Sequence, residues 1–394
     1  MTTRPSRLRP SRLGRPSTGR TISRRSFLAG LGAVGLAACT TDAGSAPTYD
    51  LGGGDELNML TWSDYIDVDD ETGPGTVSRA STALGISINY AEEYTDNEDG
   101  YQLIIDRAVD QQPPEYDIVV PTNWRAAQMI DQGWATPLPI EIIPNHANLD
   151  PAFLTNTWDR GARLQLPWQA GITGIAYDPA LTGRELTSVS DLFDSEFEGR
   201  VGVVGEMREA VGMAMLANGT DPSRPTIETA TAGLNRISAA VESGQFGAIV
   251  FDDFANLLSS GELVATMAWS GDTALLRAER PDIQFIIPDE GGIQWFDTMV
   301  IPVGAPNVRA AGRFMNYVYD PVVAATITAY VGYISPVLGV QEILASSGGD
   351  LAALAEDPLV FPDAATRSRL YTWGGLSRTD EDELDAEFAG LSIS

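Results

Sequence analysis

Residues 291–302 read Gly-Gly-Ile-Gln-Trp-Phe-Asp-Thr-Met-Val-Ile-Pro, and this apolar run predicts a strand. On a strand, Trp295 and Asp297 are two residues apart and therefore face the same side. An indole ring beside a carboxylate suits an organic cation, because the ring attracts an ammonium group and the carboxylate neutralises its charge. On this stretch alone, a core tryptophan beside a strand-end aspartate is the simpler interpretation.

The pairing of an aromatic ring with polar residues recurs at three other places, each directly after a strand-like run. These places are Trp62-Ser63-Asp64-Tyr65, Thr122-Asn123-Trp124 and Trp269-Ser270-Gly271-Asp272. In open α/β sheets, ligands lie outside the carboxyl ends of the strands. The recurrence therefore predicts one ligand-binding cleft to which several strand ends contribute.

Strand-like and helix-like segments alternate along the chain. Apolar or alternating runs predict strands over 57–62, 86–90, 116–120, 171–177, 200–204, 262–269 and 283–287. Helical spacing predicts helices between these strands and, after residue 306, over 307–319, 321–331, 340–346 and 364–371. The alternation indicates an α/β protein with mainly parallel strands, arranged as two lobes. The acidic tail, Asp380–Glu387, is interpreted as the solvated face of a helix.

The composition describes a folded and strongly acidic protein. Its 394 residues suit two or three domains or one large two-lobed body, and its formal net charge is −29. So acidic a body repels nucleic acid, whose binding depends on neutralising phosphates, and it concentrates cationic solutes. Solubility or a salty habitat explains much of this charge equally well, so the charge does not identify a site.

The first 38 residues are interpreted as an export signal that is not part of the fold. Ser23-Arg24-Arg25-Ser26-Phe27-Leu28 is similar to a twin-arginine motif, and Leu36-Ala37-Ala38-Cys39 resembles a bacterial lipobox. Cys39, the only cysteine, is therefore expected to carry a lipid. Residues 39–55 are expected to form a flexible tether. We expect the protein to be exported and lipid-anchored to the outer face of the cytoplasmic membrane.

Six segments carry a resemblance to a known family. They are Leu60-Thr61-Trp62-Ser63-Asp64-Tyr65-Ile66, Tyr116-Asp117-Ile118-Val119-Val120-Pro121-Thr122, Glu206-Met207-Arg208-Glu209, Ala268-Trp269-Ser270-Gly271-Asp272, Gly291-Gly292-Ile293-Gln294-Trp295-Phe296-Asp297 and Gly332-Tyr333. In this order they resemble the polyamine-binding proteins of ABC importers, the spermidine/putrescine-binding type. The resemblance extends over about residues 56–371. It implies a binding protein and not an enzyme, with no catalytic residues, cofactor or metal.

The resemblance implies an α/β, two-lobed periplasmic-binding-protein fold of the type II-like kind, with a ligand cleft between the lobes. The first lobe would comprise 56–164 plus 298–394, and the second lobe 165–297. The lobes would close on a polyamine by hinge motion. The protein would then deliver its ligand to the permease subunits of an ABC transporter and their ATPase. We expect a monomer that binds no nucleic acid.

The resemblance also implies which side chains contact the ligand. Ring contacts are implied for Trp62, Tyr65, Trp124, Trp269, Trp295 and Tyr333. Contacts to ammonium groups are implied for Ser63, Asp64, Glu206, Glu209 and Asp297. Thr122 takes the place of a serine of the family, and Asp272 matches a carboxylate of the putrescine-binding subtype. The pair of glutamates matches the spermidine-binding subtype, so the resemblance does not select one polyamine.

Several of these residues also have a simpler structural interpretation. Glu206 and Glu209 lie at a predicted helix start, where they can cap the helix and stabilise its N-terminus. Asp272 can be the N-cap of a helix over 273–279, and Asp64 a turn residue. His146, the single histidine, is interpreted as a residue of a surface loop.

Other functions stay open on the sequence. Binding of another organic cation, or polyamine sensing for a signalling partner, would need the same closed site. A glycosidase could use two of the carboxylates, whereas a triad hydrolase lacks a nucleophile motif for the only histidine. A metal-binding importer component is disfavoured, because Tyr330 and Tyr333 are remote from that histidine.

Overall fold

The computed structural model describes residues 54–71, 73–94, 96–109, 112–251 and 253–393. The predicted export signal 1–38, the predicted lipidation site Cys39 and the tether as far as residue 53 lie outside the described residues. Within the described ranges, no helix has the length and apolar character needed to cross a membrane.

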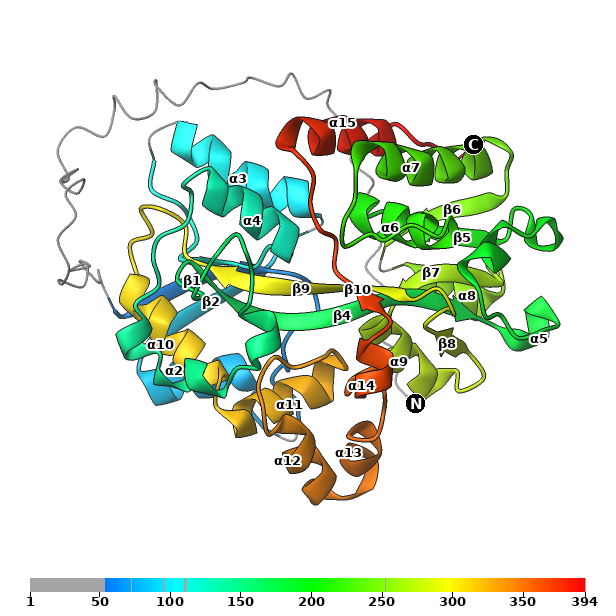
Figure 1. Ribbon diagram of the computed structural model, residues 1–394. Coiled ribbons are helices and arrows are strands. Elements are labelled where there is room, and N and C mark those ends of the chain that lie inside the picture. Colours follow the sequence, from blue (N-terminus) through cyan, green and yellow to red (C-terminus); the bar gives the residue numbers. More distant parts are fainter. Residues whose placement is uncertain (1–53, 72, 95, 110–111, 252, 394) are drawn as a thin grey trace.

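One mixed sheet runs through the molecule, with helices on both of its faces (Figure 1). Its strands are β1 (Glu56–Thr61), β2 (Ser87–Glu92), β3 (Ile118–Val119), β4 (Gln165–Tyr177), β5 (Val201–Val204), β6 (Phe246–Val250), β7 (Ala265–Trp269), β8 (Gln284–Ile286), β9 (Gly292–Val300) and β10 (Leu370–Tyr371). The strand order is β2-β1-β3-β9-β4-β7-β5-β6, while β10 pairs with β9 and β8 pairs with β4. The predicted α/β class is confirmed.

The long strands β4 and β9 form the centre of the sheet. They pair antiparallel, from Gln165 opposite Val300 to Thr173 opposite Ile293. At one end, β3 pairs with β9 at Val300, and β1 and β2 continue the sheet with parallel pairing. At the other end, β7 and β8 pair with β4, and β5 and β6 follow. The predicted strand within 291–302 is confirmed, and it belongs to both halves of the sheet.

Helices cover each half of the sheet and enclose two main hydrophobic cores. The half with β1–β3 carries α2 (Thr76–Leu84), α3 (Asn97–Val109), α4 (Asn123–Asp131), α10 (Val308–Val318), α11 (Pro321–Val331), α12 (Val340–Ser347) and α13 (Gly349–Leu354). The half with β5–β7 carries α5 (Pro179–Thr182), α6 (Met207–Ala217), α7 (Ile227–Glu242), α8 (Phe254–Ser260), α9 (Ser270–Glu279) and α15 (Arg378–Ala389). The short helix α14 (Ala364–Arg367) leads into β10.

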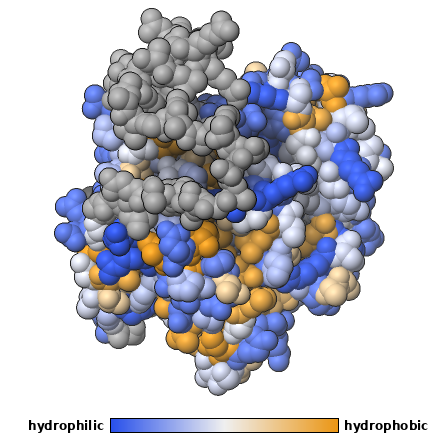
Figure 2. All heavy atoms as spheres, turned by 60° about the vertical axis from the view of Figure 1, so that its left-hand side comes forward, coloured by the Kyte–Doolittle hydropathy of each residue, from blue (hydrophilic) through white to orange (hydrophobic). Residues whose placement is uncertain are grey.

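The lower end of the molecule in Figure 1 is formed by α11, α12 and α13. Figure 2 shows hydrophobic and hydrophilic residues side by side on this end, in the face turned to the viewer. Exposed apolar side chains near these helices include Val322, Leu338 and Leu351.

The acidic tail folds differently from its interpretation as a solvated helix face. In α15, Glu381, Leu384 and Phe388 are all buried. Leu384 and Phe388 join the hydrophobic core of the half with β5–β7, and α15 packs against α7 and α6. The spacing of four between these two residues places them on one face, which the many acidic neighbours obscured in the sequence. Helix α15 therefore lies with the half that contains 165–297, and not with 56–164 as the sequence assigned it.

Two short strands escaped the sequence prediction. β6 follows α7 directly, and β10 replaces the end of the helix that was predicted over 364–371. Leu370 and Tyr371 pair with Gly292 and Ile293 at the start of β9. That pairing satisfies backbone groups over a long sequence separation, which local helical spacing does not report.

Because α15 is anchored by apolar contacts, Leu384→Ala is expected to lower the free energy of unfolding by about 2–4 kcal/mol. Leu384 is 2% exposed, so the truncation leaves a cavity in the core. Urea unfolding followed by circular dichroism measures the change. Leu351→Ala is the matched control, because Leu351 is 38% exposed and its truncation should cost less than about 0.5 kcal/mol. Equal costs for the two variants would contradict the docking of α15.

Candidate functional site

Asp297 on β9 lies at the centre of the predicted site. Its side chain is buried, and Oδ2 accepts a hydrogen bond of 2.6 Å from the hydroxyl of Tyr65. Its other oxygen, Oδ1, is buried with no hydrogen-bond partner among the described residues. Burial raises the pKa of Asp297 to about 7, although the side chains of Tyr65 and Thr122 lower it. A cation or a hydrogen-bond donor placed at Oδ1 would therefore stabilise the ionised form of this carboxylate.

Two glycines allow the aromatic rings beside Asp297 to approach the backbone. Gly171 of β4 lies opposite Trp295, and a Cβ atom at Gly171 would come 2.3 Å from Cζ2 of that indole. A Cβ atom at Gly271 would likewise come 2.5 Å from Cδ2 of Tyr333. Since such contacts are too short for any side chain, only glycine permits these ring positions.

Tyr333 joins the two sides of this aromatic group. Its ring centroid lies 5.4 Å from that of Trp295 and 5.6 Å from that of Tyr65. Its hydroxyl donates a hydrogen bond of 2.6 Å to Oδ2 of Asp272. Helix α11 ends at Val331, and the next residue, Gly332, adopts a left-handed φ of 70° and turns the chain at Tyr333. Three predicted rings and two predicted carboxylates thus form one contiguous group.

The alternative interpretation of Asp272 as a helix N-cap is wrong. Helix α9 begins at Ser270, and Trp269 occupies the N-cap position without a side-chain cap. Asp272 therefore lies in the first turn of α9, where its negative charge also favours the helix N-terminus.

A second carboxylate, Glu209 in the first turn of α6, lies next to this group. Its Oε2 accepts hydrogen bonds from the hydroxyl of Thr173 and, at 2.7 Å, from Nε1 of Trp269. The Thr173 hydroxyl also accepts a hydrogen bond of 3.1 Å from Nε1 of Trp295, so Glu209 and the aromatic group share one network. Burial and then the charge of Glu206 raise the pKa of Glu209 to about 8.

Glu206 is the third acidic group with a strongly raised pKa. Burial raises its pKa to about 7; Asp96 adds to this rise, whereas Arg208 and Asn97 oppose it. Glu206 occupies the N-cap position of α6 but makes no side-chain cap. The alternative interpretation of Glu206 as a helix cap is therefore wrong.

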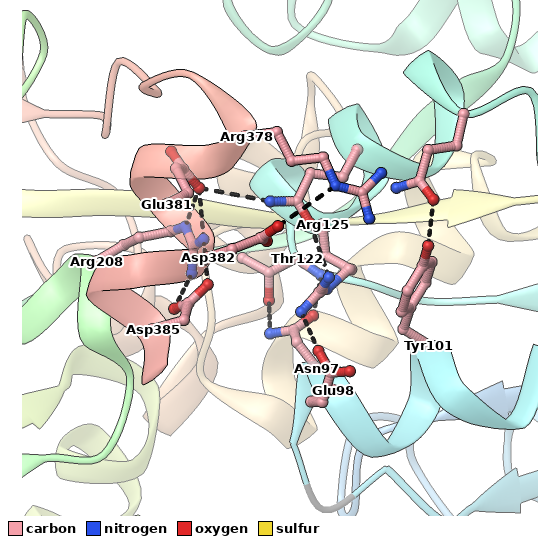
Figure 3. Close-up of polar contacts among 12 residues, drawn as sticks. Asn97, Glu98, Tyr101, Thr122, Arg125, Arg208, Arg378, Glu381, Asp382 and Asp385 are labelled. Atoms are coloured by element: carbon pink, nitrogen blue, oxygen red, sulfur yellow. Dashed lines mark hydrogen bonds and ion pairs between the residues drawn. The ribbon is translucent and has the colours of Figure 1, made fainter. Parts of the chain in front are cut away.

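Thr122 makes contacts both to Asn97 and to Asp297. The amide of Asn97 donates a hydrogen bond of 2.9 Å to the Thr122 hydroxyl, and the Thr122 backbone amide donates one of 3.0 Å to Oδ1 of Asn97 (Figure 3). The Thr122 backbone also bridges to Asp297. Thr122 lies in the turn between β3 and α4. This is the strand end at which the sequence predicted a site residue.

In the segment that follows β1, Tyr65 is buried beside Asp297, whereas Ser63 and Asp64 lie on the surface. Trp62 is half-buried; its Nε1 donates a hydrogen bond of 2.9 Å to the Val120 carbonyl, and its ring stacks on Tyr94 with centroids 4.8 Å apart. Ser63 and Asp64 are exposed, and Asp64 adopts a left-handed φ of 56°. Their predicted contacts to an ammonium group stay predictions.

Trp124, the last of the predicted rings, is covered by an arginine. Cζ of Arg208 lies 3.5 Å from the centroid of the Trp124 ring, and Cζ of Arg125 lies 4.5 Å from it. Arg208 is 2% exposed. Figure 3 shows Arg208 beside the C-terminal helix α15, with dashed lines to Glu381 and Asp385. The predicted wall of the site is therefore in contact with a cation that belongs to the chain itself.

Sequence reasoning missed Thr173, Asn97 and Arg208. Thr173 could have been found, because it faces the same side of its predicted strand as Gly171 and lies within reach of the 291–302 strand. Arg208 stood inside the quoted segment 206–209, but nothing local indicated that it was buried. Within the described ranges, no group of three or more His, Cys, Asp or Glu side chains is arranged to hold a metal ion.

Comparison with known proteins places this geometry in a family. Curated relatives include the spermidine/putrescine-binding periplasmic protein of Escherichia coli, 28% identical over 354 residues, which cover 87% of this chain and 91% of the relative. Another is the spermidine/putrescine-binding periplasmic protein 1 of Haemophilus influenzae, 26% identical over 314 residues, with 79% and 81% covered. A putrescine-binding periplasmic protein of Escherichia coli is 24% identical over 335 residues, with 80% and 85% covered.

Solved structures share the fold. A spermidine/putrescine ABC transporter substrate-binding protein of Streptococcus pneumoniae superposes with a TM-score of 0.70 at 22% identity, covering 86% of this chain and 98% of that one. A lipoprotein of Treponema pallidum gives a TM-score of 0.70 at 18% identity, with 86% and 100% covered. The predicted periplasmic-binding-protein fold is thereby confirmed. The model of the bacterial extracellular solute-binding protein family matches residues 79–362, and the chain belongs to that family of binding proteins.

Proposed function

We propose that this protein captures a polyamine, spermidine or putrescine, and delivers it to the permease subunits of an ABC transporter and their ATPase. The observation that carries the proposal is the group of buried carboxylates beside aromatic rings, above all Asp297, whose Oδ1 is buried without a partner. The similarity to spermidine/putrescine-binding and putrescine-binding proteins supports the same ligand class.

The electrostatics favour a cation with more than one charge. Asp297, Glu209 and Glu206 all have raised pKa values, because burial disfavours their ionised forms. A bound ammonium group would restore the ionised form at each position and satisfy the remaining lone pairs. The rings would contact the methylene groups between the charges, and each cation–π contact would contribute about 0.5–2 kcal/mol.

The contacts define two seats, each made of a ring and a carboxylate. The first seat combines Asp297 and Tyr65 with the rings of Trp295 and Tyr333. The second seat combines Glu209 with Trp269. Because the Trp295 and Glu209 side chains share the Thr173 hydroxyl, the two seats adjoin, as the short methylene chains of polyamines require.

The remaining features of the proposal concern delivery. The half with β1–β3 and the half with β5–β7 would close on the ligand by bending about β4 and β9. Export through the twin-arginine signal and a lipid on Cys39 would hold the monomer at the outer face of the cytoplasmic membrane, where it meets the permease. The periplasmic location of the relatives supports the extracytoplasmic part of this arrangement.

Titration calorimetry of residues 40–394 with putrescine, spermidine, spermine and agmatine tests the function. We expect tight binding of at least one polyamine. No heat with any of them would overturn the proposal, and choline, betaine and basic amino acids would then test another organic cation.

Asp297→Asn should weaken polyamine binding by more than about tenfold, because an ammonium group in a dry seat loses its counter-ion, a change that costs about 3–5 kcal/mol. Asp289→Asn is the matched control, since Asp289 is exposed and should leave the affinity unchanged. Wild-type affinity in the Asp297→Asn variant would remove Asp297 from the site.

Binding should also weaken as the pH falls. The pKa values of Asp297 and Glu209 are about 7 and about 8, so below these values a cation must displace protons in order to bind. The dissociation constant should rise between pH 8.5 and pH 6, by up to about tenfold per pH unit for each proton released. Calorimetry in buffers of different ionisation enthalpy counts the released protons.

Glu209→Gln provides the control for this linkage. The variant should bind more weakly, and its affinity should change less between pH 7 and pH 8.5, because one of the two titrating groups is gone. An affinity of the wild-type protein that is constant from pH 6 to pH 8.5 is the result that contradicts the linkage.

A further inference from the structure

A cluster of buried side-chain oxygens lies in the half with β1–β3, and none of its members belongs to the two seats. The oxygens are Oγ1 of Thr61, the hydroxyl oxygen of Tyr90 and Oδ1 of Asp67, and all three lack a hydrogen-bond partner among the described residues. Thr61 is fully buried, and Asp67 is 8% exposed. Because buried polar groups in folded proteins are bonded to protein or to ordered water, these three oxygens indicate a shared partner.

Strand register places Thr61 and Tyr90 next to each other. β1 and β2 pair parallel, with Met59 opposite Tyr90. Thr61 is two residues beyond Met59, so Thr61 and Tyr90 point to the same face of the sheet as diagonal neighbours. Burial raises the pKa of Tyr90 and the Thr61 hydroxyl lowers it, which agrees with this proximity. The two hydroxyls nevertheless do not form a hydrogen bond of acceptable geometry.

Helix α2 brings Asp67 to the same place. Only residues 85 and 86 separate α2 from β2, so the chain reverses and the two elements pack side by side (Figure 1). The first turn of α2 therefore lies toward the carboxyl end of β2, beside Tyr90. Asp67 is fixed at that turn, because its Oδ2 accepts hydrogen bonds of 3.0 Å from the backbone amide of Thr76 and from Nη2 of Arg79.

The charges of this cluster favour a neutral partner. The Asp67 carboxylate already pairs with the Arg79 guanidinium, and the other two groups are uncharged hydroxyls. A metal cation would add a charge without a counter-ion in a buried place, and a single carboxylate is a poor ligand set for Ca²⁺, which takes about six to eight oxygens. A buried water makes about three hydrogen bonds. It can accept from a hydroxyl and donate to Oδ1 of Asp67.

We propose that one buried water bridges Thr61, Tyr90 and Asp67, and that it fixes the segment between Thr61 and Asp67, which carries Trp62 and Tyr65. Thr61 directly precedes Trp62, and Asp67 follows Tyr65 by two residues, so the water would tie the two ends of the segment together. The water site itself does not depend on the proposed polyamine function, whereas its effect on ligand binding rests on that function.

The stability of two variants tests the bridge by the sign of the change. Thr61→Val and Tyr90→Phe each remove one hydroxyl and keep the shape of the side chain. If the water is present, each variant loses a hydrogen bond, so the urea midpoint of unfolding should fall. If the cluster is dry, each variant removes an unpartnered buried hydroxyl, so the midpoint should stay or rise. A midpoint that stays or rises in either variant overturns the bridge.

Tyr319→Phe is the matched control for this measurement. The Tyr319 hydroxyl is buried and donates a hydrogen bond of 2.8 Å to the carbonyl of Pro167, so its removal should lower the midpoint. Tyr90→Phe should lower the midpoint to a similar extent.

A crystal structure that resolves ordered waters tests the site directly. We expect a water oxygen within about 2.6–3.2 Å of Thr61 Oγ1, the Tyr90 hydroxyl and Asp67 Oδ1. Absence of this water overturns the proposal. So does a metal ion at the same place, which would be recognised by six or more oxygen ligands at about 2.3–2.6 Å.

Titration of putrescine and spermidine tests whether the water positions Trp62 and Tyr65. Tyr90→Phe should weaken the binding of the tighter polyamine by about threefold to tenfold, because one lost hydrogen bond loosens the segment that carries both rings. Tyr319→Phe should bind as the wild-type protein does. Unchanged affinity in Tyr90→Phe overturns the positioning role. No binding by the wild-type protein overturns the proposed function instead, and the crystal structure still decides the water site.

Discussion

The pairing of β4 with β9 is the constraint on which the rest of the structure depends. These two antiparallel strands belong to both halves of the sheet, so every strand of one half is connected to the other half through them. Trp295 and Asp297 lie on β9, and Gly171 and Thr173 lie on β4, so the pairing that joins the halves also brings the central site residues together. A change of register by one residue would turn all of them to the opposite face.

Much of this arrangement follows from local sequence. Period-two alternation and apolar runs predicted most of the strands, and the aromatic and acidic residues at their ends predicted the neighbours of Asp297. The site residues that were correctly brought together, such as Tyr65, Trp295 and Tyr333, follow turns or glycines that leave a local trace. Their geometry depends on glycines 171 and 271, whose importance is visible only when the ring that covers each of them is known.

The part that sequence reasoning could not supply depends on contacts between distant segments. Arg208 and Glu381 are 173 residues apart, and no periodicity connects them. The composition of α15 also misled the interpretation, because its acidic residues suggested a solvated tail, whereas Glu381 and Leu384 are buried. Buried charge is recognised only when its partner is known, which is why the sequence identified the Trp124 ring but not the cation that covers it.

The position of α15 in the chain has a consequence for the order in which the protein matures. Synthesis proceeds from the N-terminus, and domains tend to fold in that order. Trp124, Glu206 and Arg208 therefore emerge from the ribosome long before the helix that supplies Glu381 and Asp385. Until α15 docks, the guanidinium has neither of these two counter-ions, so the candidate site acquires its final charge only after that helix has been made.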